Sequence, residues 1–130
     1  MIGLCEAEGI GVIPWSPLAR GRLARTSAAA QSTDRAQTDA FGKTLYRSAE
    51  EADRQVIDRV GKVASSRGIA RAQVALAWLL SKSAVTAPIV GASKPGHLQD
   101  AVAALEVRLT PEELVALEEL YVPHAVSGFS

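Results

Sequence analysis

Two short segments of the chain carry residue types that could bind a nucleotide. The first is residues 15–21 (WSPLARG), and the second is residues 91–94 (GASK). Trp15 offers a flat ring on which another ring can stack. Gly91 allows close backbone approach, and Ser93 and Lys94 open a predicted helix whose free N–H groups and dipole attract phosphate. Together these residues suit a ligand with a planar ring at one end and phosphates at the other.

Each segment follows an apolar run that predicts a β-strand. Residues 10–13 (IGVI) are bounded by glycine and Pro14 and are expected to be buried. Residues 85–90 contain Pro88, which removes a ladder donor and predicts a short or irregular strand. Two such strands separated by helices predict a parallel pair with a crossover. Since ligands bind beyond the carboxyl ends of parallel strands, both segments are expected at one edge.

The chain before and between these strands predicts a short helix, one long loop and two further helices. A short helix over residues 2–8 ends at Gly9, and residues 16–47 lack periodicity and predict the loop. Ser48 and Glu51 have capping-box spacing and open a helix that ends at Gly68. Residues 72–80 are apolar nearly all round, with Gln73 the exception, and therefore predict a buried helix.

Two further helices follow the second strand. The first begins at residues 93–95 and has a predicted core stripe of Leu98, Ala101, Val102 and Leu105. The last begins at residues 109–114 (LTPEEL), where Thr110 caps, Pro111 fits the first turn and Glu113 completes a capping box. Its apolar face continues through Leu117, Leu120 and Tyr121. Two strands cannot cover so many apolar helix faces, so the sequence predicts part of a larger α/β fold.

Composition narrows the possible partners and locations. The 130 residues suit one domain, and the 14 basic and 14 acidic side chains give no broad field for nucleic acid or an anionic membrane. The longest apolar run, residues 74–80, is far short of the roughly 20 residues of a membrane span. Residues 1–12 lack a basic segment and carry Glu6 and Glu8, which argues against a secretory signal.

Cys5 is the only cysteine in the sequence. A single cysteine excludes an intramolecular disulfide and a cysteine metal cluster, and it predicts a cytoplasmic location.

Each candidate binding residue also has a plainer interpretation. Trp15 could be a core aromatic, and Ser93 could act only as a helix N-cap. His97 could be a solvated helix residue. A solvated loop face is favoured over a phosphate clamp for the three loop arginines, Arg20, Arg22 and Arg25.

Three ordered blocks of the sequence carry a family resemblance. They are residues 11–21 (GVIPWSPLARG), 72–80 (AQVALAWLL) and 88–98 (PIVGASKPGHL). The blocks resemble the seventh strand, the following helix, and the eighth strand with its phosphate-binding turn in the aldo-keto reductases. The resemblance covers residues 1 to about 121 and is greatest for bacterial reductases similar to potassium-channel beta subunits. It implies that residues 1–130 are a partial aldo-keto reductase domain, the C-terminal portion of a (β/α)8 TIM barrel with strands 7 and 8 and their helices.

The resemblance also implies a cofactor, NADPH/NADP+, and the reduction of small aldehydes and ketones. It places the nicotinamide on Trp15, the pyrophosphate along residues 16–19, and the adenosine phosphates at Gly91 and Ser93. His97 and Lys94 would favour NADPH over NADH, and Asp100 stands where an acidic residue contacts the adenine. The residues implied for cofactor binding are Trp15, Ser16, Pro17, Leu18, Ala19, Gly91, Ser93, Lys94, His97 and Asp100.

The family's catalytic Asp, Tyr, Lys and His lie on earlier strands, and no residue of this sequence matches their motifs. We therefore assign no catalytic residue and no metal ligand, and expect no reductase activity from the isolated chain. Two alternatives stay open. The chain could be an inactive NADPH-binding or docking module, or a poorly folded truncated product. Neither nucleic acid nor a membrane is an expected partner, and the sequence does not fix the oligomeric state.

Overall fold

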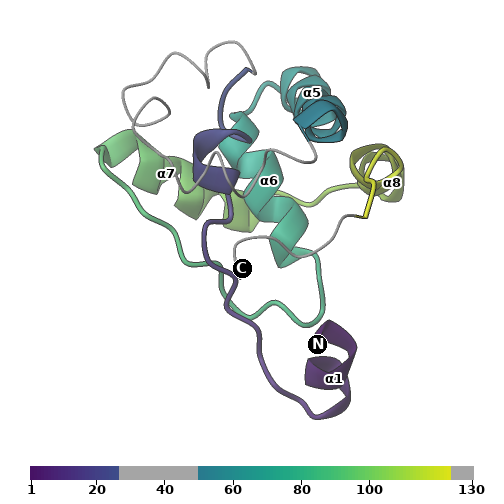
Figure 1. The fold of residues 1–130 in the computed structure, drawn as a ribbon. Coiled ribbons are helices and arrows are strands. Elements are labelled where there is room, and N and C mark those ends of the chain that lie inside the picture. Colours follow the sequence, from purple (N-terminus) through teal and green to yellow (C-terminus); the bar gives the residue numbers. More distant parts are fainter. Residues whose placement is uncertain (27–49, 124–130) are drawn as a thin grey trace.

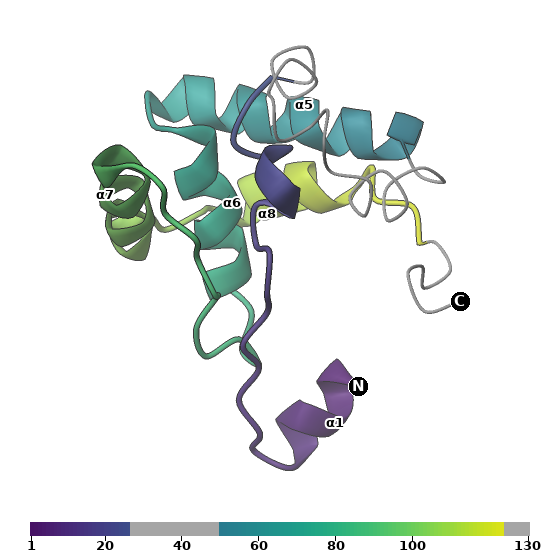
Figure 2. The same cartoon turned by 60° about the vertical axis from the view of Figure 1, so that its left-hand side comes forward.

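The computed structural model describes residues 1–26 and 50–123, which form a cluster of helices and an extended N-terminal arm (Figure 1). Helix α6 lies between α7 on one side and α5 with α8 on the other, as the second view also shows (Figure 2). Within these residues no helix has the length and apolar character needed to cross a membrane. The elements are α1 (Ile2–Ala7), η1 (Ala19–Gly21), α5 (Glu50–Arg67), α6 (Arg71–Leu80), α7 (Pro95–Ala103), η2 (Ala104–Glu106) and α8 (Pro111–Glu118).

The core lies where α5, α6 and α8 meet. Its buried residues are Val60, Val63, Ala64, Val74 and Leu117. The three residues from α5 lie at helical spacing and so share one face. Burying each large side chain of this kind stabilises the fold by about 1.5–3 kcal/mol relative to exposure. The core therefore fixes α6, the helix that the sequence predicts to be buried, and residues 74–77 of α6 are indeed buried.

The predicted helix ends at glycine are confirmed. Gly9 follows α1 and Gly68 follows α5, both with φ of +65°, a conformation that only glycine adopts without strain. Helix α5 is described from Glu50 onward. The predicted cap Ser48 and residues 27–47 of the predicted loop lie outside the described residues.

The two predicted strands do not form a regular ladder among the described residues. They meet at two isolated parallel bridges, Val12 with Val85 and Trp15 with Ile89. The parallel pairing is confirmed, but the predicted burial of residues 10–13 is wrong, because Ile10 is 55% and Ile13 61% exposed. A pair of strands with no third strand beside it in the described part leaves one face of each apolar side chain uncovered.

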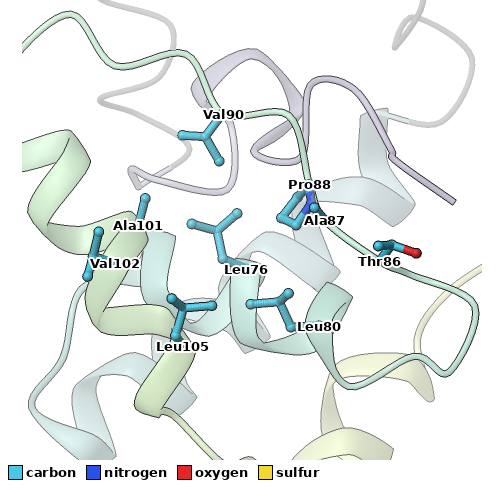
Figure 3. A pocket seen from close by; sticks show the side chains of 9 residues that line it. All are labelled: Leu76, Leu80, Thr86, Ala87, Pro88, Val90, Ala101, Val102 and Leu105. Atoms are coloured by element: carbon cyan, nitrogen blue, oxygen red, sulfur yellow. The ribbon is translucent and has the colours of Figure 1, made fainter. Parts of the chain in front are cut away.

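The predicted core stripe of α7 is also wrong for three of its four residues. Leu98, Val102 and Leu105 are more than half exposed. Helix α7 contacts α6 and η2, and these contacts leave Leu98 and Val102 more than half exposed. Val102 and Leu105 instead border an apolar hollow of about 260 Å³ between α6, residues 86–90 and α7 (Figure 3). The lining residues are Leu76, Leu80, Thr86, Ala87, Pro88, Val90, Ala101, Val102 and Leu105.

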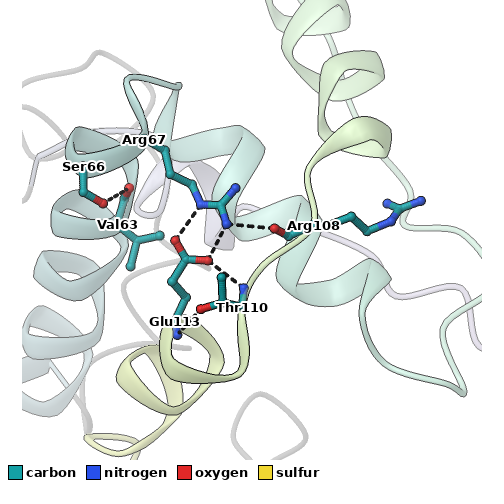
Figure 4. Close-up of polar contacts among 6 residues, drawn as sticks. All are labelled: Val63, Ser66, Arg67, Arg108, Thr110 and Glu113. Carbon is teal, nitrogen blue, oxygen red and sulfur yellow. Dashed lines mark hydrogen bonds and ion pairs between the residues drawn. The ribbon is translucent and has the colours of Figure 1, made fainter.

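The predicted start of the last helix is confirmed in detail. Thr110 caps α8, Pro111 occupies its first turn, and Thr110 and Glu113 form both hydrogen bonds of a capping box. Arg67 at the end of α5 donates two hydrogen bonds of 2.6 Å to the Glu113 carboxylate and one of 2.8 Å to the carbonyl of Arg108 (Figure 4). One carboxylate therefore joins the cap of α8 to the end of α5.

A second polar tie joins α6 to α8. The indole Nε1 of Trp78 donates to Glu118 over 2.8 Å, and Lys82 donates to the same carboxylate. These two donors, Lys82 foremost, lower the pKa of Glu118. The ammonium of Lys82 also lies 4.7 Å from the Trp78 ring centre, a cation–π distance. Together with the first tie, this contact holds α8 against both neighbouring helices.

The Glu113 contact predicts an acid-dependent loss of stability. The hydrogen bonds from Arg67, foremost, lower the pKa of Glu113 below the ordinary value of 4.5. Its contribution to the free energy of unfolding is therefore fully present above pH 4.5 and is lost as the pH falls through the lower folded value. We expect Glu113→Gln to lower the Tm near neutral pH and to flatten the fall of Tm below pH 4.5, measured by thermal circular dichroism. The exposed Glu106→Gln is the control, and equal acid profiles for Glu113→Gln and wild type would contradict the assignment.

Candidate functional site

The two strands run side by side in the same direction toward the candidate site. The amide of Val12 donates to the carbonyl of Ala84 over 2.8 Å, and the amide of Thr86 donates back to Val12 over 2.9 Å. The amide of Ile89 donates to the carbonyl of Pro14 over 2.9 Å. Because the pairing is parallel, the segments that follow Trp15 and Ile89 leave the pair at the same end.

A glycine makes this close pairing possible. A Cβ atom at Gly11 would lie 2.1 Å from the Thr86 hydroxyl oxygen and 3.2 Å from its Cβ. No side chain fits at the first distance unless its neighbour moves. Gly11 therefore lets the two strands approach closely enough to form the bridges at Val12 and Trp15, which follow it.

The first strand ends in a tight turn that carries the exposed Trp15 ring. Trp15 is 60% exposed, so its interpretation as a core aromatic is wrong. Ser16, Ala19 and Arg20 have φ values of +51°, +47° and +56°, which cost non-glycine residues about 1–3 kcal/mol each. The turn is closed by the amide of Ala19, which donates to the carbonyl of Ser16, and by the amide of Arg20, which donates to the Ser16 hydroxyl. Pro17 and Leu18 lie between these contacts.

The second strand ends in an exposed turn that leads into α7. A Cβ atom at Gly91 would meet no other atom within 4 Å, and Ser93 and Lys94 are exposed. Lys94 is the N-cap residue of α7, and no side chain caps this helix. The interpretation of Ser93 as the N-cap is therefore wrong. The first turn of α7 keeps N–H groups without a side-chain acceptor, the arrangement that attracts anions.

The two remaining predicted residues lie on one face of α7. His97 is exposed, and Asp100 follows three residues later, so the two side chains are neighbours on the helix surface. Asp100 is partly buried and accepts a hydrogen bond of 2.8 Å from the side chain of Gln73 on α6. Gln73 is the polar exception in the otherwise apolar segment of residues 72–80, and this contact gives its side chain a partner.

A loop arginine, the apolar hollow and possible metal ligands were also compared with the candidate site at the ends of the two strands. Arg22 forms an ion pair of 3.5 Å with Asp53 on α5, so this loop arginine contacts a carboxylate in addition to solvent. The apolar hollow was missed by sequence reasoning, and Thr86 is its only lining residue with a side-chain oxygen. Within residues 1–26 and 50–123, no group of three His, Cys, Asp or Glu side chains could hold a metal ion.

The comparisons with known proteins agree with the sequence motifs. Residues 1–122 match the model of the Aldo/keto reductase family. The chain belongs to the aldo/keto reductase family. The family fold is a (β/α)8 barrel.

Several fungal reductases are similar to nearly the whole chain. A versiconal hemiacetal acetate reductase from Aspergillus parasiticus is 49% identical over 127 residues, covering 97% of this chain and 36% of that protein. The aldo-keto reductase dtxS3 from Metarhizium robertsii is 42% identical over 126 residues, 97% of this chain and 33% of that protein. The aldo-keto reductase AMT2 from Alternaria alternata is 37% identical over 130 residues, 100% of this chain and 34% of that protein. The chain thus spans about a third of the length of these curated relatives. The closer likeness to bacterial reductases similar to potassium-channel beta subunits stays a prediction.

The Gly11 contact yields a test of the strand pairing. We expect Gly11→Ala to lower the free energy of unfolding by about 1–3 kcal/mol, the usual cost of an overpacked contact, measured by urea denaturation. In a Thr86→Ala background the hydroxyl is gone, and the same substitution should cost less. Equal costs in the two backgrounds would show that Gly11 and Thr86 are not in contact.

Proposed function

We propose that this chain supplies the NADPH-binding part of an aldo-keto reductase that reduces small aldehydes or ketones. It would form the C-terminal portion of the barrel, with strands 7 and 8 and their helices, and would bring no catalytic residue of its own. The observation that carries the proposal is the parallel bridge between Trp15 and Ile89. This bridge sets an exposed aromatic ring and an uncapped helix start at the same end of two adjacent strands.

The chemistry of the residues at this edge fits a dinucleotide. At one tip, the exposed Trp15 ring can cover the face of a planar base such as nicotinamide. At the other, the ammonium of Lys94 and the first-turn N–H groups of α7 suit a phosphate group, and His97 lies on the same helix end. Gly91 has open space where a side chain would stand, so a ligand can approach its backbone.

Residues 16–19 would line the pyrophosphate between the two tips. The left-handed residues Ser16 and Ala19, the hydrogen bond between them and the bond from the Arg20 amide to the Ser16 hydroxyl hold this turn in one shape before a ligand arrives. A turn that is already ordered loses less conformational entropy on binding, so its preorganisation favours affinity.

The reaction itself needs groups outside these 130 residues. Bound NADPH would supply a hydride to the carbonyl carbon of the substrate. This chain's residues would hold the two ends of the dinucleotide, and the group that protonates the carbonyl oxygen would come from another part of the protein. The similarity to a versiconal hemiacetal acetate reductase supports a reductase role for the whole protein. The proposed cytoplasmic location rests on the cysteine content alone.

A docking role has one observation in its favour. The apolar side chains of Leu98 and Val102 on α7 and of Leu105 on η2 are more than half exposed, as are Ile13 and Ile89 on the strands. These surfaces suit burial against further protein. An inactive module that binds NADPH and docks onto a partner is therefore the second candidate function.

The phosphate role of Lys94 predicts a cofactor preference. We expect Lys94→Ala to weaken NADPH binding about 3- to 10-fold and to leave NADH binding nearly unchanged, because one charge-assisted hydrogen bond to phosphate is lost. Dissociation constants from isothermal titration calorimetry measure both. Lys62→Ala removes an exposed lysine of α5 and is the matched control. Equal weakening for the two dinucleotides would contradict a contact with the 2′-phosphate.

The lack of a catalytic group predicts that the purified chain turns over no carbonyl compound. NADPH oxidation followed by absorbance, with an aromatic and an aliphatic aldehyde as substrates, should not exceed the rate without protein. Any protein-dependent turnover would show that these 130 residues hold a proton donor.

A further inference from the structure

The turn that follows Trp15 needs support from outside itself. Ser16, Ala19 and Arg20 have positive φ values, and strained residues of this kind persist only where the surrounding structure holds them. Backbone hydrogen bonds run through residues 16–24 and join them into one unit. The bridge at Trp15 fixes where this unit begins, so contacts with the helices must fix where it ends.

Arg71, at the start of α6, contacts the end of this turn unit. Its guanidinium nitrogen Nη1 donates to the carbonyl of Arg25 over 3.4 Å and to the carbonyl of Ile57 on α5 over 3.1 Å. One side chain of α6 thus joins the residue that follows the unit to α5. Both acceptors are backbone atoms, so the contact fixes the course of the chain without depending on another side chain.

A glycine in α5 makes room for this guanidinium. Gly61 is buried within α5, where glycine lowers helix stability relative to alanine. A Cβ atom at Gly61 would lie 2.1 Å from Nη2 and 2.4 Å from Cζ of Arg71, and its three nearest atoms all belong to the guanidinium. The glycine therefore costs the helix stability and leaves a notch in which the Arg71 head group lies.

Two other contacts hold the middle of the turn unit. Leu23 packs against the core, and Arg22 forms its ion pair with Asp53 on α5. The contact of Arg71 comes after both in the chain, at the carbonyl of Arg25. It is therefore the contact that closes the end of the unit against α5 and α6.

We propose that Arg71 is a positioning residue for the nucleotide: seated on Gly61, it fixes the end of the turn unit and keeps residues 16–19 in the shape that binds. The inference rests on the proposed function, in which residues 16–19 line the pyrophosphate. Arg71 acts through the population of the ordered turn and not through a contact with the nucleotide. If only a fraction of the molecules has this turn ordered, the apparent Kd rises by the inverse of that fraction.

The variant Arg71→Ala tests the effect on binding. In the full 130-residue chain we expect it to weaken NADPH binding about 3- to 10-fold, measured by isothermal titration calorimetry, because the ordered turn falls to roughly a tenth to a third of the molecules. In the free chain, hydrogen exchange of the Ala19 and Gly21 amides, which donate to Ser16 and Leu18, should become faster. Nuclear magnetic resonance measures this exchange without any ligand.

The matched control is Arg59→Ala. It removes an arginine of α5 whose side chain pairs with Glu119 over 2.7 Å. This ion pair ties α5 to the end of α8 and does not involve the turn unit. We expect Arg59→Ala to lower the Tm and to leave the NADPH affinity and the exchange of both turn amides at the wild-type values.

The substitution Gly61→Ala separates positioning from stability. In the wild-type background the new Cβ displaces the guanidinium, so NADPH binding should weaken as in Arg71→Ala. In the Arg71→Ala background the notch is empty, and Gly61→Ala should raise the Tm because alanine favours the helix. The affinity should not change further, because both substitutions act on one contact. The double variant is therefore expected to be more stable than Arg71→Ala and to bind NADPH no better.

The outcomes separate this inference from the function on which it rests. If the wild-type chain does not bind NADPH, the proposed function and the inference both fail. If it binds, and Arg71→Ala binds equally well with unchanged amide exchange, the proposed function stands and the inference is overturned. If Arg59→Ala weakens binding as much as Arg71→Ala, or if the double variant regains affinity along with its Tm, Arg71 acts only through stability and the positioning role is overturned.

Discussion

Two parallel backbone contacts determine where the candidate site lies. The bridges of Val12 with Val85 and of Trp15 with Ile89 align strands that are more than 70 residues apart in sequence. Without them, the turn after Trp15 and the start of α7 would have no fixed relation to each other. The absence of a side chain at Gly11 permits the close approach, and the parallel direction sends both turns to one end of the pair.

The packed helices α5, α6 and α8 hold the helix that contacts the candidate site. Residues 74–77 of α6 are buried, and the Glu113 and Glu118 contacts hold α8 against α5 and α6. Helix α6 in turn carries Gln73, whose amide reaches Asp100 on α7. The proposed nucleotide contacts thus depend on the same apolar packing that stabilises the fold. The strained turn of residues 16–20 is the exception, because its left-handed conformations cost stability and suit a binding role.

Local signals in the sequence predicted the helices well and the strands incompletely. The capping residues Thr110 and Glu113 and the terminal glycines Gly9 and Gly68 act through neighbouring backbone groups, so their effects can be read from the sequence. Burial of the strand residues depends on what lies beside them, and Ile10 and Ile13 are exposed because the described part supplies one neighbouring strand. The apolar face of α7 is exposed for the same reason, because the described part supplies too few neighbouring elements to cover it.

Sequence reasoning identified the two turns of the candidate site but not how their residues are held. Motif resemblance pointed to Trp15 and Lys94, and family membership is now shown by the match over residues 1–122. Neither the N-cap position of Lys94 nor the Gln73–Asp100 contact could be predicted, since each depends on side-chain geometry or on contacts between distant helices.

The central claim is that one dinucleotide bridges both strand tips. Nuclear magnetic resonance of the ¹⁵N-labelled chain during titration with NADPH tests it most directly. The account predicts that the Trp15 indole N–H and the backbone amides of residues 91–97 shift along one binding curve, while the Trp78 indole, bonded to Glu118, stays in place. Shifts confined to one tip, or separate curves for the two, would contradict the account.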